Sequence, residues 1–185
     1  MNLDHLLAVG QATDEQIVEY MVQTYYTMLY RLGLHMLRDH DDAEDAAQET
    51  IVTASQKIGQ YRVGTEMRAW VYAIGVNTCR AMWRKRQWQN RLHEVLVWLG
   101  QDRSDAAASP EHHTLRSERD AHLWQAINKL SEKHRLPLIL RYAHELSTAE
   151  IADVLGINEG TVRSRLHYAH RQLEARLVLI EEVNP

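Results

Sequence analysis

A run of hydrogen-bond donors in the last quarter of the chain is the part of the sequence best suited to binding another molecule. Its members are arginines, hydroxyl residues and a histidine: Thr161, Arg163, Ser164, Arg165, His167, Tyr168 and Arg171. Guanidinium groups pair with guanine edges or with phosphates, and hydroxyl and imidazole groups reach bases or the backbone. These residue types at this density predict a surface that contacts nucleic acid.

The spacing around these donors predicts two short helices joined by a tight turn. Ser147 and Glu150 have capping-box spacing, and Gly156 suits the turn that follows. Asn158 can cap the next helix. The apolar residues of that helix recur every three to four positions, at Val162, Leu166, Ala169 and Leu173. The donors then face outward, as in a helix-turn-helix whose second helix enters the major groove; a plain helical hairpin with a solvated basic face is the alternative.

Charge is segregated along a chain whose net charge is only -4. Residues 39–49 hold six acids and no lysine or arginine, whereas residues 78–93 hold five bases and no acid. Residues 161–176 hold four arginines and a single acid. Such segregation suits a protein that meets both a basic protein surface and a phosphate backbone.

The composition predicts a binding protein of the cytoplasm and not an enzyme. Cys79 is the only cysteine, which excludes an internal disulfide and a thiolate metal cluster. The chain has no long apolar run and no basic, apolar leader at its start, so we expect neither a membrane span nor secretion. Eleven histidines raise the alternative of a helical enzyme or metal protein. However, no zinc-binding, phosphate-loop or nucleophile-elbow motif occurs, and we expect no metal and no cofactor.

The pattern of apolar residues predicts an all-α fold of two small helical domains joined by a flexible linker. Only 8 glycines and 3 prolines interrupt the 185 residues, and no alternating strand pattern occurs. Polar, small residues around 100–110 indicate a linker. We therefore expect domains over 1–95 and 117–185, with a linker over 96–116.

The individual helices are expected at residue ranges set by their capping residues. Thr13 should cap the first, and Asp41 with Glu44 should cap a second that runs to about 58. After a break at 59–65, Thr65 should cap a third to about 89. The second domain should hold helices over 117–130, 131–144 and a pair within 147–184, with Pro137 causing a kink or a later start.

Three segments, in this order, resemble the extracytoplasmic-function sigma factors of RNA polymerase. "DAEDAAQETIVTASQKIGQY" is similar to the family's polymerase-binding region. "GTEMRAWVYAIGVNTCRAMWRKR" is similar to the segment that melts and reads the downstream −10 element. "LPLILRYAHELSTAEIADVLGINEGTVRSRLHYAHRQL" resembles the region that binds the upstream −35 element. The resemblance covers roughly residues 18–90 and 115–177.

The resemblance implies a role for each segment. The residues that match the surface for the clamp helices of the largest polymerase subunit are Asp42, Asp45, Gln48 and Glu49. The residues that match the −10 segment are Tyr61, Arg62, Arg68, Trp70, Asn77, Arg80, Arg84 and Lys85. In the family the loop at 59–65 captures a flipped base, for which Tyr61 and Arg62 offer stacking and charge, whereas Trp70 also suits a plain core position.

In the second domain the positions that read bases in the family match Arg163, Ser164, His167 and Tyr168. The positions that the family uses more often for phosphate contact or packing match Thr161, Arg165 and Arg171. The implied partners are RNA polymerase core, through its clamp helices and flap, promoter DNA and an anti-sigma factor.

The sequence also departs from the family. It has no phenylalanine, so that Ile51 and Met67 stand where phenylalanine is usual, and Ser55 stands where tryptophan is common. His167 and Tyr168 leave the promoter sequence open, since those positions set it. The rival interpretation is a helix-turn-helix regulator that acts without polymerase core; it does not account for the 59–65 loop or the basic helix that follows.

Overall fold

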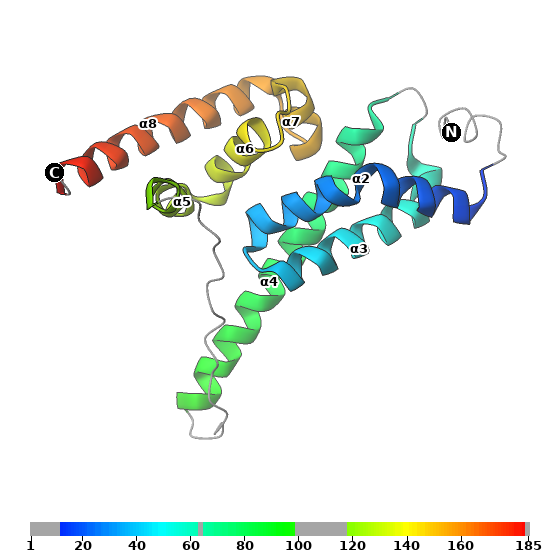
Figure 1. Ribbon diagram of the computed structural model, residues 1–185, viewed down its shortest axis with the longest axis horizontal. Helices are drawn as coiled ribbons and strands as arrows, with labels where there is room; N and C mark the ends of the chain where they lie inside the picture. Colours follow the sequence, from blue (N-terminus) through cyan, green and yellow to red (C-terminus); the bar gives the residue numbers. More distant parts are fainter. Residues whose placement is uncertain (1–11, 63–64, 99–117, 184–185) are drawn as a thin grey trace. The chain divides into compact units, whose positions relative to one another are not determined.

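The computed structural model describes residues 12–62, 65–98 and 118–183, and all regular structure within these ranges is helical (Figure 1). The chain divides into two compact units, Met1–His112 and His113–Pro185. The predicted all-α fold with two helical domains is confirmed. The exact boundaries and the flexible linker remain predictions, because residues 99–117 lie outside the described ranges.

The first unit is built from three long helices, α2 (Asp14–Leu37), α3 (His40–Gln56) and α4 (Met67–Trp98). Each of them packs against the other two, and Figure 1 shows α2 and α3 side by side with α4 crossing them. Their apolar stripes meet in one core, whose buried members are Ile17, Met21, Tyr25, Leu29, Ala47, Ile51, Ala54, Tyr61, Met67 and Val71. The apolar residues that recur along each helix therefore form the surfaces through which the three helices pack.

A glycine permits the close approach of α2 and α3. A Cβ added at Gly33 would lie 2.8 Å from the Cα of Ala43, closer than real Cβ atoms approach other atoms. Both residues are buried, so the backbones meet where neither helix carries a large side chain. This seam fixes α3, and with it the acidic residues on the outer side of α3.

The caps of the first unit agree with the sequence in one case and correct it in another. Thr13 and Gln16 form the predicted capping box at the start of α2. The cap of α3 is Asp39 and not Asp41, because the Asp39 carboxylate accepts hydrogen bonds of 3.0 Å from the backbone N–H groups of Asp41 and Asp42. The helix therefore starts at His40, and Asp41 lies in its first turn.

The helix α4 also differs from its expected bounds. It begins at Met67, two residues after the predicted cap Thr65, whose hydroxyl donates to the carbonyl of Arg62 over 2.8 Å. It continues to Trp98 instead of ending near 89, since residues 76–99 hold no glycine or proline. A short 3₁₀ turn, Ile58–Gln60, occupies part of the predicted break.

The family departures leave the core filled. Ile51 and Met67 are buried within it, so apolar side chains occupy the positions where phenylalanine was expected. Ser55 is half-buried, and its hydroxyl donates to the carbonyl of Ile51 over 2.9 Å. The serine hydroxyl thus has a hydrogen-bond partner within its own helix.

The second unit contains α5 (Glu118–Asn128), α6 (Glu132–Tyr142), α7 (Thr148–Leu155) and α8 (Glu159–Val183). Helix α8 packs against the other three. One cluster of the core joins α5, α6 and α8 through Ala126, Ile127, Leu130, Leu138, Ala169 and Leu173. Pro137 lies buried inside α6, which nevertheless starts at Glu132, so the alternative of a later start is wrong.

No helix among the described residues is long and apolar enough to cross a membrane. The same ranges hold no group of three or more histidine, cysteine or acidic side chains that could bind a metal ion. Cys79 is buried in the first unit, and this burial raises the pKa of its thiol to about 12. The thiol therefore stays protonated at neutral pH and packs as a small apolar group.

Candidate nucleic-acid interface

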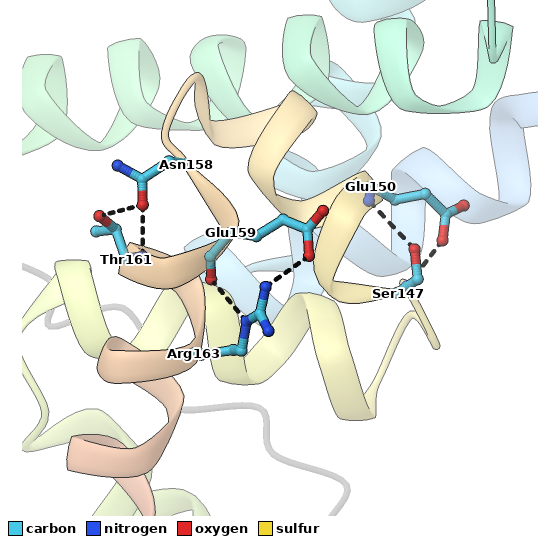
Figure 2. A network of polar contacts seen from close by, with 6 residues as sticks. All are labelled: Ser147, Glu150, Asn158, Glu159, Thr161 and Arg163. Carbon is cyan, nitrogen blue, oxygen red and sulfur yellow. Dashed lines mark hydrogen bonds and ion pairs between the residues drawn. The ribbon is translucent and has the colours of Figure 1, made fainter.

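Helices α7 and α8 form the predicted helix-turn-helix. Ser147 and Glu150 make both hydrogen bonds of the capping box at the start of α7, at 3.2 and 2.7 Å (Figure 2). Gly156 ends this helix with a φ of 63°, a conformation that glycine adopts without strain. Helices α7 and α8 pack against each other, and Ile151 of the first and Val162 of the second are both buried.

The start of α8 is fixed by Asn158. Its side-chain oxygen accepts from the backbone N–H of Thr161 at 2.8 Å and from the Thr161 hydroxyl at 2.9 Å, as Figure 2 shows. Thr161 thereby commits its hydroxyl proton to the cap. Of the seven residues predicted to contact DNA in this unit, Thr161 and Arg165 are half-buried. The five that are exposed are Arg163, Ser164, His167, Tyr168 and Arg171.

Arg163 is held by a neighbour that the sequence analysis did not select. Its Nη2 lies 3.0 Å from Oε2 of Glu159, one turn earlier, and its Nε donates to the Glu159 carbonyl at 3.5 Å (Figure 2). The two side chains are 68% and 48% exposed, so the pair is surrounded by water. The four-residue spacing of acid and base was the available signal for this contact.

Tyr168 is held from a different helix. Its ring lies 4.3 Å, centroid to centroid, from the imidazole of His134 in α6, and its hydroxyl accepts from Gln172 at 3.0 Å. Desolvation, followed by the nearby charges of Lys133 and Arg165, lowers the pKa of His134. A neutral imidazole therefore supports the tyrosine ring at neutral pH. Sequence spacing gave no signal for this contact, because the two residues come from separate helices.

The first unit brings the four predicted polymerase-binding residues together. Asp42, Asp45, Gln48 and Glu49 line one groove between α3 and α4. Its remaining lining residues are the cap of α3, Asp39, one residue of α3, Val52, and five of α4, Ala81, Met82, Lys85, Arg86 and Gln89. One wall of the groove is therefore acidic, and the other carries two cations.

One of these four predicted polymerase-binding residues, Asp42, already pairs with another residue of the chain. The Asp42 carboxylate lies 2.8 Å from Nη1 of Arg86, and the two side chains are 34% and 40% exposed. Next to this pair, the hydrogen bond from the Asp42 N–H and the charge of Arg86 hold the pKa of Asp39 below its ordinary value. Asp45, Gln48 and Glu49 are exposed.

In the predicted base-capturing loop, Tyr61 is buried instead of offering its ring to a base. Tyr61 is only 7% exposed, its hydroxyl donates to the Thr65 carbonyl at 2.6 Å, and its ring centroid lies 5.5 Å from that of Trp70. A base therefore cannot stack on Tyr61 in this conformation, and the ring supports the loop from inside. Arg62 is exposed, whereas residues 63–64 lie outside the described ranges. Trp70 is half-buried and packs against the core.

The remaining predicted −10 residues lie on α4, and not all on one side of it. Asn77, Arg80 and Arg84 fall within one side at helical spacing, with Lys85 at its edge. Asn77, Arg84 and Lys85 are exposed and Arg80 is half-buried. Arg68 lies on another side, where its guanidinium is 5.6 Å from the ring centre of Tyr72. The structure thus separates Arg68 from the other four.

Two family profiles match the chain, one in each unit. "Sigma-70 region 2" matches residues 21–89, and "Sigma-70, region 4" matches residues 121–173. The second match contains the helix-turn-helix, and the first contains the acidic groove and the basic side of α4. The rival interpretation of a regulator without a polymerase-binding part is not favoured, because it leaves the first match without explanation.

Curated relatives are similar over almost the whole chain. The ECF RNA polymerase sigma factor SigW of Bacillus subtilis is 30% identical over 170 residues, which cover 89% of this chain and 90% of that protein. The ECF RNA polymerase sigma factor SigL of Mycobacterium tuberculosis is 31% identical over 169 residues, which cover 90% and 92%.

Solved structures of similar fold include two complexes. The sigma factor RpoE bound to the anti-sigma factor NepR, from Bartonella quintana, has a TM-score of 0.63 at 26% identity, covering 86% of this chain and 95% of that one. CnrH bound to the cytosolic domain of CnrY has a TM-score of 0.68 at 21% identity, covering 96% and 99%, which shows the fold alone. With both family profiles in their order and relatives of this coverage, the chain belongs to the extracytoplasmic-function sigma factors of RNA polymerase.

Proposed function

We propose that the first unit binds RNA polymerase core and opens the −10 element, while the second unit reads the −35 element. The chain then acts by binding and not by catalysis, in the cytoplasm where the polymerase works. The observation that carries the proposal is the presence, in one chain, of an acidic groove on one unit and an arginine-bearing recognition helix on the other.

The first turns of α8 are proposed to read bases. Arg163, Ser164, His167 and Tyr168 are the exposed donors there, and an arginine in this part of a recognition helix reaches guanine O6 and N7. Arg165 and Arg171 are assigned to phosphates. Thr161 is assigned to the cap, since its hydroxyl already donates to Asn158.

Asp45, Gln48 and Glu49 are proposed to meet the polymerase clamp helices, and Asp42 to brace the groove. The first three are exposed on one wall of it, whereas Asp42 is paired with Arg86. A carboxylate-rich wall gains on-rate and register against a basic partner surface. The polymerase flap, the other implied contact with core, is proposed to meet the second unit.

The −10 contacts are proposed to come from Arg62 in the loop and from Asn77, Arg80, Arg84 and Lys85 on α4. Tyr61, Arg68 and Trp70 are assigned to positioning, because each of them packs against another ring or the core. Strand opening needs cations beside the backbone and room for unpaired bases, and the exposed side of α4 supplies the cations.

An anti-sigma factor is a further proposed partner. The RpoE structure, similar to this chain at 26% identity, is a complex with one. A partner that occupies the acidic groove or α8 would compete directly with polymerase or DNA, so binding alone can regulate the chain.

The test is transcription in vitro with purified core polymerase and a pool of genomic promoter fragments. We expect the chain to direct initiation from a subset that shares two elements at constant spacing. Asp45→Lys with Glu49→Lys should weaken the core complex. Glu15→Lys with Glu19→Lys is the matched control, because both are exposed acids of α2 at the same four-residue spacing and neither lines the groove. A chain that binds promoter duplex but neither binds core nor directs initiation would contradict the proposal.

A further inference from the structure

Among the tryptophans of α4 whose side chains the structure describes, two are exposed, and the core explains the exposure of one of them. Trp83 is 44% exposed and Trp88 is 68% exposed. Trp83 continues the buried series of Tyr72, Val76 and Cys79, at spacings of four, three and four residues. It therefore lies on the side of the helix that faces the core, at the point where the core ends.

Trp88 lies on a different side of α4. At 3.6 residues per turn, five positions rotate it by about 140° from Trp83, and eleven positions bring it back to within about 20° of Asn77. It thus extends the side that carries Asn77 and Arg84, and it does not line the acidic groove. The core gives no reason for an exposed aromatic ring at this position.

The charged residues of α4 that lie nearest to Trp88 along the chain are all positive. Arg84 lies one turn before it and Arg91 nearly one turn after it, and both are exposed. No acid occurs between residues 78 and 93. Proteins that bind single-stranded DNA combine aromatic faces on which bases stack with cations that track the phosphates. A basic protein surface would be repelled here, whereas an unpaired DNA strand offers both a ring and an anion.

We propose that Trp88, between Arg84 and Arg91, is a stacking platform for an unpaired base of the opened promoter strand. It extends the strand-binding side of α4 beyond Asn77 by eleven residues, or about 16 Å at 1.5 Å per residue. The inference rests on the proposed −10 function of this helix and adds to it a contact with a base face.

The experiment measures binding of holoenzyme, formed from core polymerase and each variant, to a fluorescein-labelled non-template strand from a promoter that the wild-type chain transcribes. Core alone gives the background. Stacking of one base contributes about 1–3 kcal/mol, so Trp88→Ala should weaken strand binding by about 5-fold or more. Trp88→Phe should retain most of the affinity. Trp83→Ala is the matched control and should change it less than 2-fold.

Circular dichroism and core affinity are measured first for every variant. Because Trp88 is exposed, Trp88→Ala should leave helicity and core binding unchanged. Equal losses of strand affinity for the two alanine variants, or no loss for Trp88→Ala, would overturn the proposal that Trp88 is a stacking platform. A loss of core affinity with strand binding intact would also overturn it, in favour of a protein contact. If Arg84→Ala still weakens strand binding while Trp88→Ala does not, only this inference fails; if neither does, the −10 role of α4 fails as well.

Discussion

Replacing Arg163 with alanine should separate base reading from general attraction to DNA. In the free chain its guanidinium pairs with Glu159 at 3.0 Å, and both side chains lie largely in water. An exposed pair at this spacing contributes about 0.3–0.5 kcal/mol. A bidentate guanine contact contributes about 1–3 kcal/mol of discrimination against the wrong base. Arg163 therefore gains more from the correct base than it loses on leaving Glu159.

The net gain, about 0.5–2.7 kcal/mol, corresponds to about a 2- to 100-fold preference for promoter over scrambled DNA. We expect Arg163→Ala to reduce this preference by that factor. Glu159→Gln should raise promoter affinity by no more than about 2-fold, because it removes only the exposed pair. Arg171→Ala is the comparison variant: eight residues, or about 12 Å, further along α8, it should contact backbone.

The assay is competition binding of promoter and scrambled duplex, repeated over a series of salt concentrations. Arg171→Ala should weaken both duplexes alike and reduce the salt slope by about one, whereas Arg163→Ala should lower the promoter affinity selectively. If both variants lower the two affinities in the same ratio, α8 does not read bases through Arg163, and the assignment of its first turns is refuted.

Three further predictions concern the first unit. Exchanging Asp45 and Glu49 for lysine should slow association with core more at low salt than at high salt, and a salt-independent rate would argue against electrostatic docking. Tyr61→Ala should lower the free energy of unfolding in urea by about 3–5 kcal/mol, the usual loss for a large buried ring. Tyr61→Phe should lower it by only about 0.5–1.5 kcal/mol, the contribution of one hydrogen bond; equal losses would show that the ring is not core. Burial, then the charge of Arg31, lowers the pKa of His35, so the folded state binds its proton less readily than the unfolded state. The free energy of unfolding should therefore fall as pH decreases below about 6.5, and His35→Gln should flatten that part of the curve.

Local signals account for what the sequence predicted well. The capping boxes at Thr13 and Ser147 and the turn at Gly156 each depend on residues within a few positions, and all three occur as expected. The cap of α3 was placed two residues late because Asp39 and Asp41 are chemically equivalent in sequence. Only the backbone geometry decides which carboxylate meets the first free N–H groups.

Contacts between distant residues account for what the sequence could not predict. The burial of Tyr61 depends on how the loop folds back onto the core, and its residue type suits a stacking loop equally well. The contact of His134 with Tyr168 depends on the packing of α6 against α8. The helix α4 extends past its expected end near residue 89 because residues 90–98 hold no glycine or proline, so no residue there strongly disfavours the helix.

The cap at Asn158 sets the rotational phase of α8. Each later residue is rotated by about 100° about the helix axis, so the position of the cap decides the direction in which every donor of the helix points. The contact of His134 with Tyr168 holds the same helix at a second point, about ten residues on, or nearly three turns. A residue inserted after Asn158 would leave the composition of the donors intact and turn their whole array by about a quarter of a circle. The side chains that α8 can bring to a DNA groove thus depend on the rotation of the helix about its axis as much as on its residue types.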